Sequence, residues 1–342
     1  MMDVEPVGVL LTVLGVVLVG VGFADAIITT TAIAEFPGPL TRVLSVSLWR
    51  GFKMLSSRSD SALLRAAGSL VILSVISAWV ATIWLGWALI FAGSPGAVVH
   101  GETGQAASFA SVIYFTATSV ATTGVGDFVP ATDGWRLLTG LVSVSGIALI
   151  TLGVTYLVPI IQAGVNRQHL AHRLNTLGSS PHDILMRGFD GSSFDRLVGR
   201  FPGLTDELTQ LRAEHLAYPV LQFLHGARLE SALAPRVAAL DEALTLLEHG
   251  VGSNVNYPAG ELLPLREAID ALLETMAAEA VANPTAEAPY VPSLEPLRKA
   301  GIPTVADAAL DEALLDASDR RNLLLAYVRD DGWLWEDVYR DV

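Results

Sequence analysis

The stretch Thr118–Asp127 reads Thr-Ser-Val-Ala-Thr-Thr-Gly-Val-Gly-Asp, so it combines hydroxyl side chains with two closely spaced glycines. It lies between long uncharged segments, where backbone without partners is costly. The apolar stretch Ser108–Val120 leads into it and is too short to cross a bilayer, and Phe128–Thr132 leads back out. Membranes tolerate such a re-entrant form only where it is buried in protein or lines a water-filled cavity. The chemistry open to the loop is therefore to present oxygen atoms to a solute inside the membrane.

Three apolar runs predict the helices that must position this loop. No charged residue occurs between Ala66 and Gly101 or between Leu137 and Asn166, and Asp25 is the one charge in the first run. Each run reaches the ~20 residues that an α-helix needs to cross the hydrocarbon core. With 16% charged residues and a mean hydropathy of +0.48, the chain is more apolar than soluble proteins usually are. We predict membrane spans near residues 7–30, 66–93 and 136–164.

The charges around these runs predict how the chain crosses the membrane. The first run could be a signal peptide, but Asp3 and Glu5 precede it and it is longer than a signal-peptide core, so we predict a retained helix. The 36–65 segment is rich in Lys and Arg, whereas the 94–135 segment is mainly acidic. The positive-inside rule then predicts a multi-pass protein of the cell membrane, with the N-terminus outside and the C-terminal domain in the cytoplasm.

The sequence divides into four parts: an N-terminal membrane helix over 1–35, an interfacial amphipathic segment over 36–65, a membrane domain over 66–165 and an acidic domain over 166–342. Apolar residues and cations alternate over Leu40–Leu55, which predicts a helix on the inner membrane face with Trp49 at headgroup depth. The alternative is a short connector that packs against the membrane domain.

Residues 166–342 carry −12 of the total net charge of −14, which argues against a nucleic-acid partner. Helical periodicity over Leu229–Leu247 and Leu262–Met276 predicts an all-helical domain, Ser180 reads as a helix N-cap and 283–292 reads as a linker. The fold class is thus an all-α membrane protein with three transmembrane helices, one re-entrant helix and loop, and a helical cytoplasmic domain.

The residues Tyr114-Phe115, followed by Ala121-Thr-Thr-Gly-Val-Gly-Asp-Phe-Val-Pro130, resemble the pore loop of potassium channels, whose filter commonly reads Thr-Val-Gly-Tyr-Gly-Asp. The span, pore loop and span of that family match over roughly residues 64–165. The resemblance implies passive K⁺ conduction through a homotetramer in the lipid bilayer. It implies a selectivity filter made of Thr122, Thr123, Gly124, Val125 and Gly126. K⁺ would bind the backbone carbonyls of the first four and the Thr122 hydroxyl, and Asp127 would stand at the outer mouth.

The resemblance also implies a gating hinge at Gly146, the position of the inner-helix glycine of the family, with Gly153 and Pro159 as further soft points. Val125 stands where the family has Tyr, and Thr123 where it has Val. A non-selective cation channel of the same architecture and a non-conducting, membrane-anchored signalling or scaffold protein are therefore alternatives.

The sequence predicts no cofactor beyond permeant K⁺ and no enzymatic activity, because no nucleophile–base pair or metal-ligand cluster stands out. Cysteine is absent, which excludes disulfides and thiol chemistry. His169 and His172 could sense pH or bind a metal as a ring, although such spacing is more typical of a solvated helix face. The sequence indicates neither a gating ligand nor a partner for the acidic domain.

Overall fold

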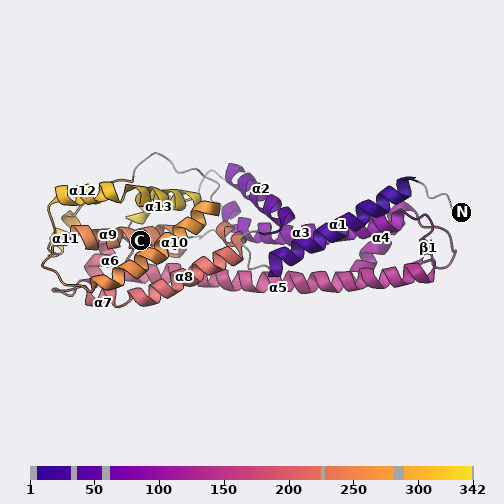
Figure 1. Cartoon of the computed structure of the whole chain (residues 1–342), viewed down its shortest axis with the longest axis horizontal. Helices are drawn as coiled ribbons and strands as arrows, with labels where there is room; N and C mark the ends of the chain where they lie inside the picture. The colour runs from indigo at the N-terminus through magenta and orange to yellow at the C-terminus, as the bar shows by residue number, and fades with distance from the viewer. Residues whose placement is uncertain (1–5, 32–36, 56–61, 225–227, 280–288, 341–342) are drawn as a thin grey trace. The chain divides into compact units, whose positions relative to one another are not determined.

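The computed structural model describes residues 6–31, 37–55, 62–224, 228–279 and 289–340. The chain forms two compact units, one of residues 1–48 and 70–159 and the other of residues 49–69 and 160–342. Figure 1 labels the elements along the chain. The protein is an all-α membrane protein: three helices are long and apolar enough to cross a membrane, among the residues described. The first unit is built from α1 (Pro6–Thr31), β1 (Val98–His100), α4 (Phe109–Val120), β2 (Phe128–Pro130) and most of α2 (Pro39–Leu55), α3 (Ala62–Ala92) and α5 (Asp133–Leu177).

Glycines spaced seven residues apart bring α1 against α3. A Cβ on Gly15 would clash with the Gly86 carbonyl, and a Cβ on Gly8 would clash with the Gly93 carbonyl. The order of these pairs along the chain shows that the two helices are antiparallel. Backbones can approach this closely only where side chains are missing, and such small-residue contacts drive helix association in membranes. The α1 helix is therefore an integral part of this unit.

Three tryptophans of α3 each donate an indole N–H to a different element. Trp79 donates to the Asp25 carboxylate of α1 at 2.8 Å. Trp84 donates to the Ile113 carbonyl of α4 at 3.2 Å, and Trp87 donates to the Ser145 hydroxyl of α5 at 3.0 Å. An indole N–H in an apolar environment is costly without a partner, so these bonds fix α3 against three neighbours.

Asp25 joins the end of α1 to the start of α2. Its carboxylate is 1% exposed and accepts hydrogen bonds from the Leu40 amide at 2.7 Å and the Thr41 hydroxyl at 2.6 Å. A Cβ on Gly38 would overlap this carboxylate, so only glycine fits there. The carboxylate satisfies amides that α2 leaves open at its N-terminus, where negative charge is favoured. Asp25 therefore joins α1 to α2 through its carboxylate.

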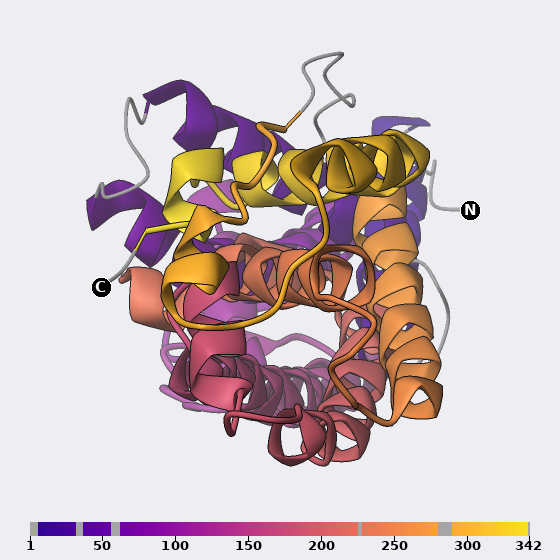
Figure 2. The same cartoon turned by 90° about the vertical axis from the view of Figure 1, so that its left-hand side faces the viewer.

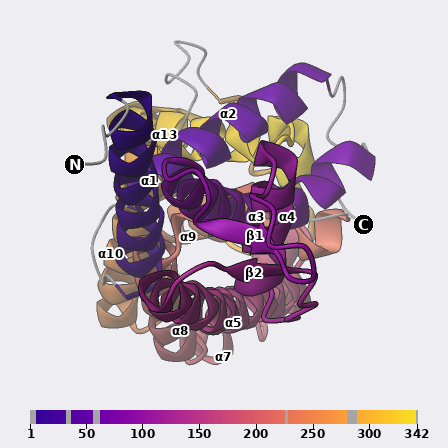
Figure 3. The same cartoon turned by 90° about the vertical axis from the view of Figure 1, so that its right-hand side faces the viewer.

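The α4 helix and a small sheet form the end of the unit that faces the viewer in Figure 3. The side chain of Ser108 caps α4 by accepting from the Ser111 amide at 3.2 Å. Strands β1 and β2 pair antiparallel, with His100 opposite Phe128. These strands could not be predicted from hydropathy patterns because each is three residues long. Their pairing joins the segment that precedes α4 to the segment that follows the glycine-rich loop. The end of the loop away from α4 is therefore held by the sheet.

The second unit is helical and encloses α9 (Leu233–Thr245), all of whose residues are buried. Figure 2 shows the helices around it. They are α6 (Pro181–Gly188), α7 (Asp195–Val198), α8 (Phe201–Ala217), α10 (Leu262–Glu279), α11 (Glu295–Lys299), α12 (Asp307–Asp316) and α13 (Ser318–Asp330), with 3₁₀ turns at Pro219–Phe223, Leu229–Ser231, Ala259–Glu261 and Trp335–Val338 and a π turn at Leu246–Gly250. Ser180 caps α6, as predicted, by accepting from the Asp183 amide.

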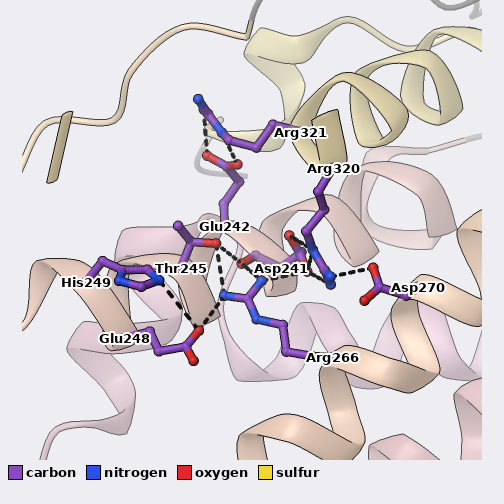
Figure 4. A network of polar contacts seen from close by, with 9 residues as sticks. All are labelled: Asp241, Glu242, Thr245, Glu248, His249, Arg266, Asp270, Arg320 and Arg321. Atoms are coloured by element: carbon purple, nitrogen blue, oxygen red, sulfur yellow. Dashed lines mark hydrogen bonds and ion pairs between the residues drawn. The ribbon is translucent and has the colours of Figure 1, made fainter. Parts of the chain in front are cut away.

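Two adjacent acids of α9 are paired with two adjacent arginines of α13 (Figure 4). Asp241 is fully buried and accepts from Arg320 at 3.0 Å and from Arg266 at 2.9 Å. Glu242 is 1% exposed and accepts from both ends of the Arg321 guanidinium, at 2.7 and 3.0 Å. Removing one partner of a buried pair leaves an uncompensated charge, which costs about 3–5 kcal/mol. The two pairs therefore fix the register of α13 on α9.

The spans agree with the predicted ranges except at one end. The α5 helix continues thirteen residues past the predicted limit of 164, to Leu177, because hydropathy marks where a helix leaves the apolar phase and not where it ends. Trp49 is 4% exposed and its ring lies 5.2 Å from that of Phe223, so it is packed inside protein instead of facing headgroups. The predicted position of Trp49 at headgroup depth is therefore not what this packing shows, and its partner Phe223 belongs to the second unit and not to the membrane domain. Of the predicted 283–292 linker, residues 283–288 lie outside the described part of the chain.

Candidate functional site

The C-terminus of α4 passes directly into the glycine-rich loop. The Thr123 amide donates to the Thr118 carbonyl at 2.9 Å, and the Thr122 amide donates to the Ser119 carbonyl at 3.1 Å. These two bonds form the Schellman motif that closes many helix C-termini. The motif requires a left-handed residue between helix and loop, and Thr122 occupies that position with a φ of 56°.

Thr122 is an unusual choice for a left-handed position. Glycine is the common residue there because it has no Cβ, and a left-handed conformation costs other residues about 1–2 kcal/mol. A β-branched residue in this region is an outlier. Thr122 is also the one positive-φ residue other than glycine among the described residues. Such strain concentrates at functional positions, where the role of the side chain outweighs the stability that the strain costs.

The backbone of the loop alternates in handedness. Thr122, Gly124 and Gly126 have φ values of 56°, 58° and 86°, whereas Thr123 and Val125 between them do not have positive φ. Within the described part of the chain, the carbonyl oxygens of residues 122–126 accept no hydrogen bond. These residues are also exposed in the single chain. A row of unpaired carbonyl oxygens in an otherwise apolar unit requires polar partners from elsewhere.

The far end of the loop is fastened at Asp127. The Gly101 amide, in the turn after β1, donates to the Asp127 carbonyl at 2.8 Å. The phenol of Tyr114 on α4 lies near the Asp127 carboxylate. The Phe128 ring lies against the rings of His100 and Tyr114, at 5.4 and 6.3 Å between centroids. The chain thus supplies a phenol beside the loop although Val125 has none.

The α5 helix touches the end of α4 directly beneath the loop. The Ser143 hydroxyl donates to the Ser119 carbonyl at 3.2 Å. One turn further, a Cβ on Gly146 would overlap the Val120 carbonyl, so the two backbones are in contact there. At Gly153 the nearest atom to a Cβ would be a methyl of Ile76 at 3.9 Å, which leaves room for a side chain. Both glycines line an apolar cavity of about 460 Å³ between α3, α4 and α5.

The other predicted positions on α5 are a proline and two histidines. Pro159 lies within the helix, which continues on both sides of it. His169 and His172 lie on the same helix and are exposed, which agrees with a solvated face. In the described ranges, no three His, Cys, Asp or Glu residues are grouped in a way that could hold a metal ion.

The structure also identifies supporting residues that sequence reasoning missed. They are the tryptophan donors of α3, Tyr114 and Gly101 at the far end of the loop, and Ser143 of α5. One signal could have found the tryptophans: an indole N–H in an uncharged span needs an acceptor from another element. No comparable signal exists for Gly101 or Ser143, because their contacts depend on the three-dimensional path of the loop.

Comparison with known proteins agrees with this geometry. Residues 74–163 match a family model described as an ion channel, which supports the resemblance of this segment to a pore-loop channel. The chain is also similar to the uncharacterized membrane protein YdjJ of Bacillus subtilis (strain 168), with 29% identity over 321 residues that cover 94% of each chain. No solved structure matches.

Proposed function

We propose that the chain is one subunit of a potassium-selective or potassium-preferring channel, in which residues 122–126 form the selectivity filter. The observation that carries this proposal is the alternating backbone of the loop together with its unpaired carbonyl oxygens. Alternating handedness turns successive peptide groups so that their oxygens point to one side, and glycine allows this at Gly124 and Gly126 without strain. Potassium channels replace the hydration shell of the ion with such rings of backbone carbonyls.

The neighbouring groups suit a cation. The Thr122 hydroxyl would add the innermost oxygens, and its retention in a strained conformation supports that role. The α4 helix points its C-terminus, with a partial charge of about −0.5, toward the base of the loop. The Asp127 carboxylate at the other end would raise the local cation concentration.

One loop supplies only part of a ring, so the proposal includes four copies around a common axis. The exposure of residues 121–127 in the single chain supports this, because an assembly would cover or hydrate them. The proposal also puts the 36–65 segment and the C-terminal domain on the cytoplasmic side, with the loop opening outward, and the cations of the 36–65 segment support this orientation. The gating hinge at Gly146, with Gly153 and Pro159, is part of the same proposal.

The test is cation flux into vesicles that contain the purified full-length protein. We expect K⁺ and Rb⁺ uptake to exceed Na⁺ uptake, and Gly124→Ala to lower K⁺ uptake at least about tenfold, because a Cβ at φ 58° strains every subunit. Gly104→Ala is a matched control. Gly104 also has a positive φ, of 67°, and open space around its Cβ position, but it lies outside the loop.

The outcomes separate the alternatives. Equal K⁺ and Na⁺ uptake would favour the non-selective channel, which the missing phenol at Val125 makes the main rival. A folded protein without any uptake would favour the scaffold function. Equal effects of the substitutions at Gly124 and Gly104 would show that residues 122–126 are not the filter.

A further inference from the structure

Thr123 makes two bonds to the same atom of α4. Its amide donates to the Thr118 carbonyl at 2.9 Å, and its hydroxyl donates to that carbonyl at 3.0 Å. The first bond belongs to the Schellman motif and is available to any residue except proline. The second requires a hydroxyl group. The Thr123 side chain is therefore turned back toward α4, away from a role as an oxygen donor in the loop.

The acceptor is well suited to hold the loop in place. Thr118 lies in the last turn of α4, where carbonyl oxygens have no partner within the helix. Its own hydroxyl donates to the Phe115 carbonyl at 2.9 Å and therefore does not take part in the bonds to Thr123. A carbonyl oxygen has two lone pairs, and the amide and hydroxyl of Thr123 use both.

The remaining attachments of the loop lie at its other end. There, the Gly101 amide donates to the Asp127 carbonyl, and the Val125 side chain in the middle has no group that can form a hydrogen bond. Among the described residues, the spacing of the carbonyl oxygens between Thr122 and Gly126 thus depends on the attachments at the two ends of the loop. The hydroxyl of Thr123 is the side-chain component of the attachment nearest α4.

We propose that Thr123 is a positioning residue of the filter, whose hydroxyl bond to the Thr118 carbonyl holds the carbonyl spacing that favours K⁺ over Na⁺. The inference rests on the proposed channel function and names the group that gives the filter its selectivity. An oxygen cage that relaxes can contract around a smaller ion, so loss of the bond is expected to lower discrimination before it lowers conduction.

The experiment compares Thr123→Val, Thr123→Ser and Thr118→Val in vesicles that contain the full-length protein. Valine has nearly the shape of threonine but lacks the hydroxyl. Serine retains the hydroxyl and lacks the methyl group. Thr118→Val leaves the backbone acceptor in place and is the matched control. We expect Thr123→Val to lower the ratio of K⁺ to Na⁺ uptake about fivefold, the factor for one hydrogen bond of typical net strength, and the other two variants to stay within about twofold of wild type.

Each outcome decides between the inference and its rivals. A Thr123→Val variant with unchanged or increased selectivity and unchanged K⁺ uptake would overturn the inference and leave the proposed function intact. Equal loss in Thr123→Val and Thr123→Ser would overturn it too, since the methyl group would then matter and not the hydroxyl. A wild-type protein without cation uptake would instead overturn the proposed function, and this inference with it. Thermal unfolding of each variant checks that differences in uptake do not arise from misfolding.

Discussion

Thr122 combines a hydroxyl group that could bind an ion with a backbone conformation that lowers stability. Its φ of 56° is the conformation that a glycine would adopt with little cost in a Schellman motif. A threonine there brings a hydroxyl group and a strained backbone together. If the protein needed only a turn at this position, glycine would serve better. The strain therefore points to the side chain as the reason for the residue, and a substitution can test this.

We expect Thr122→Gly to stabilise the protein and impair its function. Removing the Cβ relieves about 1–2 kcal/mol of backbone strain, partly offset by about 0.5–1 kcal/mol for the greater freedom of glycine in the unfolded chain. Thermal unfolding of the purified protein should therefore occur at an equal or higher temperature, whereas K⁺ uptake should fall. Thr122→Ser retains the hydroxyl and should keep most of the uptake. A glycine variant that is destabilised and still conducts would contradict the explanation.

Among the elements, α5 has two glycines with different surroundings. Gly146 is in backbone contact with Val120, and Ser143 is bonded to the same end of α4 one turn earlier. Gly153 lines the apolar cavity and has room for a Cβ, with a methyl of Ile76 at 3.9 Å. Any movement of α5 at Gly146 would thus act on the base of the loop. The family resemblance implies a hinge at Gly146. The contact with the Val120 backbone also requires a residue without a side chain there.

Substitution of each glycine by alanine tests how these surroundings affect stability. We expect Gly146→Ala to lower the stability by about 1–3 kcal/mol, because the added Cβ overlaps the Val120 carbonyl and must push α5 away from α4. Gly153→Ala should change it by less than about 0.5 kcal/mol, since its Cβ has room. Thermal unfolding of both variants in the same detergent checks the difference. Similar effects at the two sites would argue against a packing role for Gly146.

The elements also show what sequence can predict. The three spans and α4 follow from hydropathy and length, which are local properties, and their predicted centres agree with the structure. The left-handed positions at Gly124 and Gly126 follow from residue type. Thr122 could not be predicted as left-handed, because its residue type argues against it. The bonds of Trp79 to Asp25 and of Gly101 to Asp127 join residues 54 and 26 positions apart. Local sequence patterns cannot predict contacts between residues so far apart in the chain.

At the scale of the whole molecule, the two units differ in net charge and in their buried polar groups. The C-terminal domain carries most of the net negative charge, and it holds its buried acids in ion pairs with arginines. Its interior also contains His215 on α8, which is 1% exposed and hydrogen-bonds the Leu211 carbonyl at 3.0 Å. Burial lowers the pKa of His215 to about 4, because the imidazolium form would lose its hydration. The folded domain therefore holds this histidine neutral.

The lowered pKa makes the stability of this domain depend on pH. In the unfolded chain the histidine binds a proton below about pH 6.5, whereas in the folded domain it does so only below about 4. Unfolding then takes up a proton between these values, so stability is complete above about pH 6.5 and falls as the pH drops toward 4, by on the order of 3 kcal/mol. Protection of the α8 and α9 amides against hydrogen exchange, corrected for intrinsic rates, measures this in the full-length protein. His215→Gln has no titratable group there and should lose less protection between pH 7 and pH 5 than wild type. Equal losses in the two proteins would assign the pH dependence to other residues.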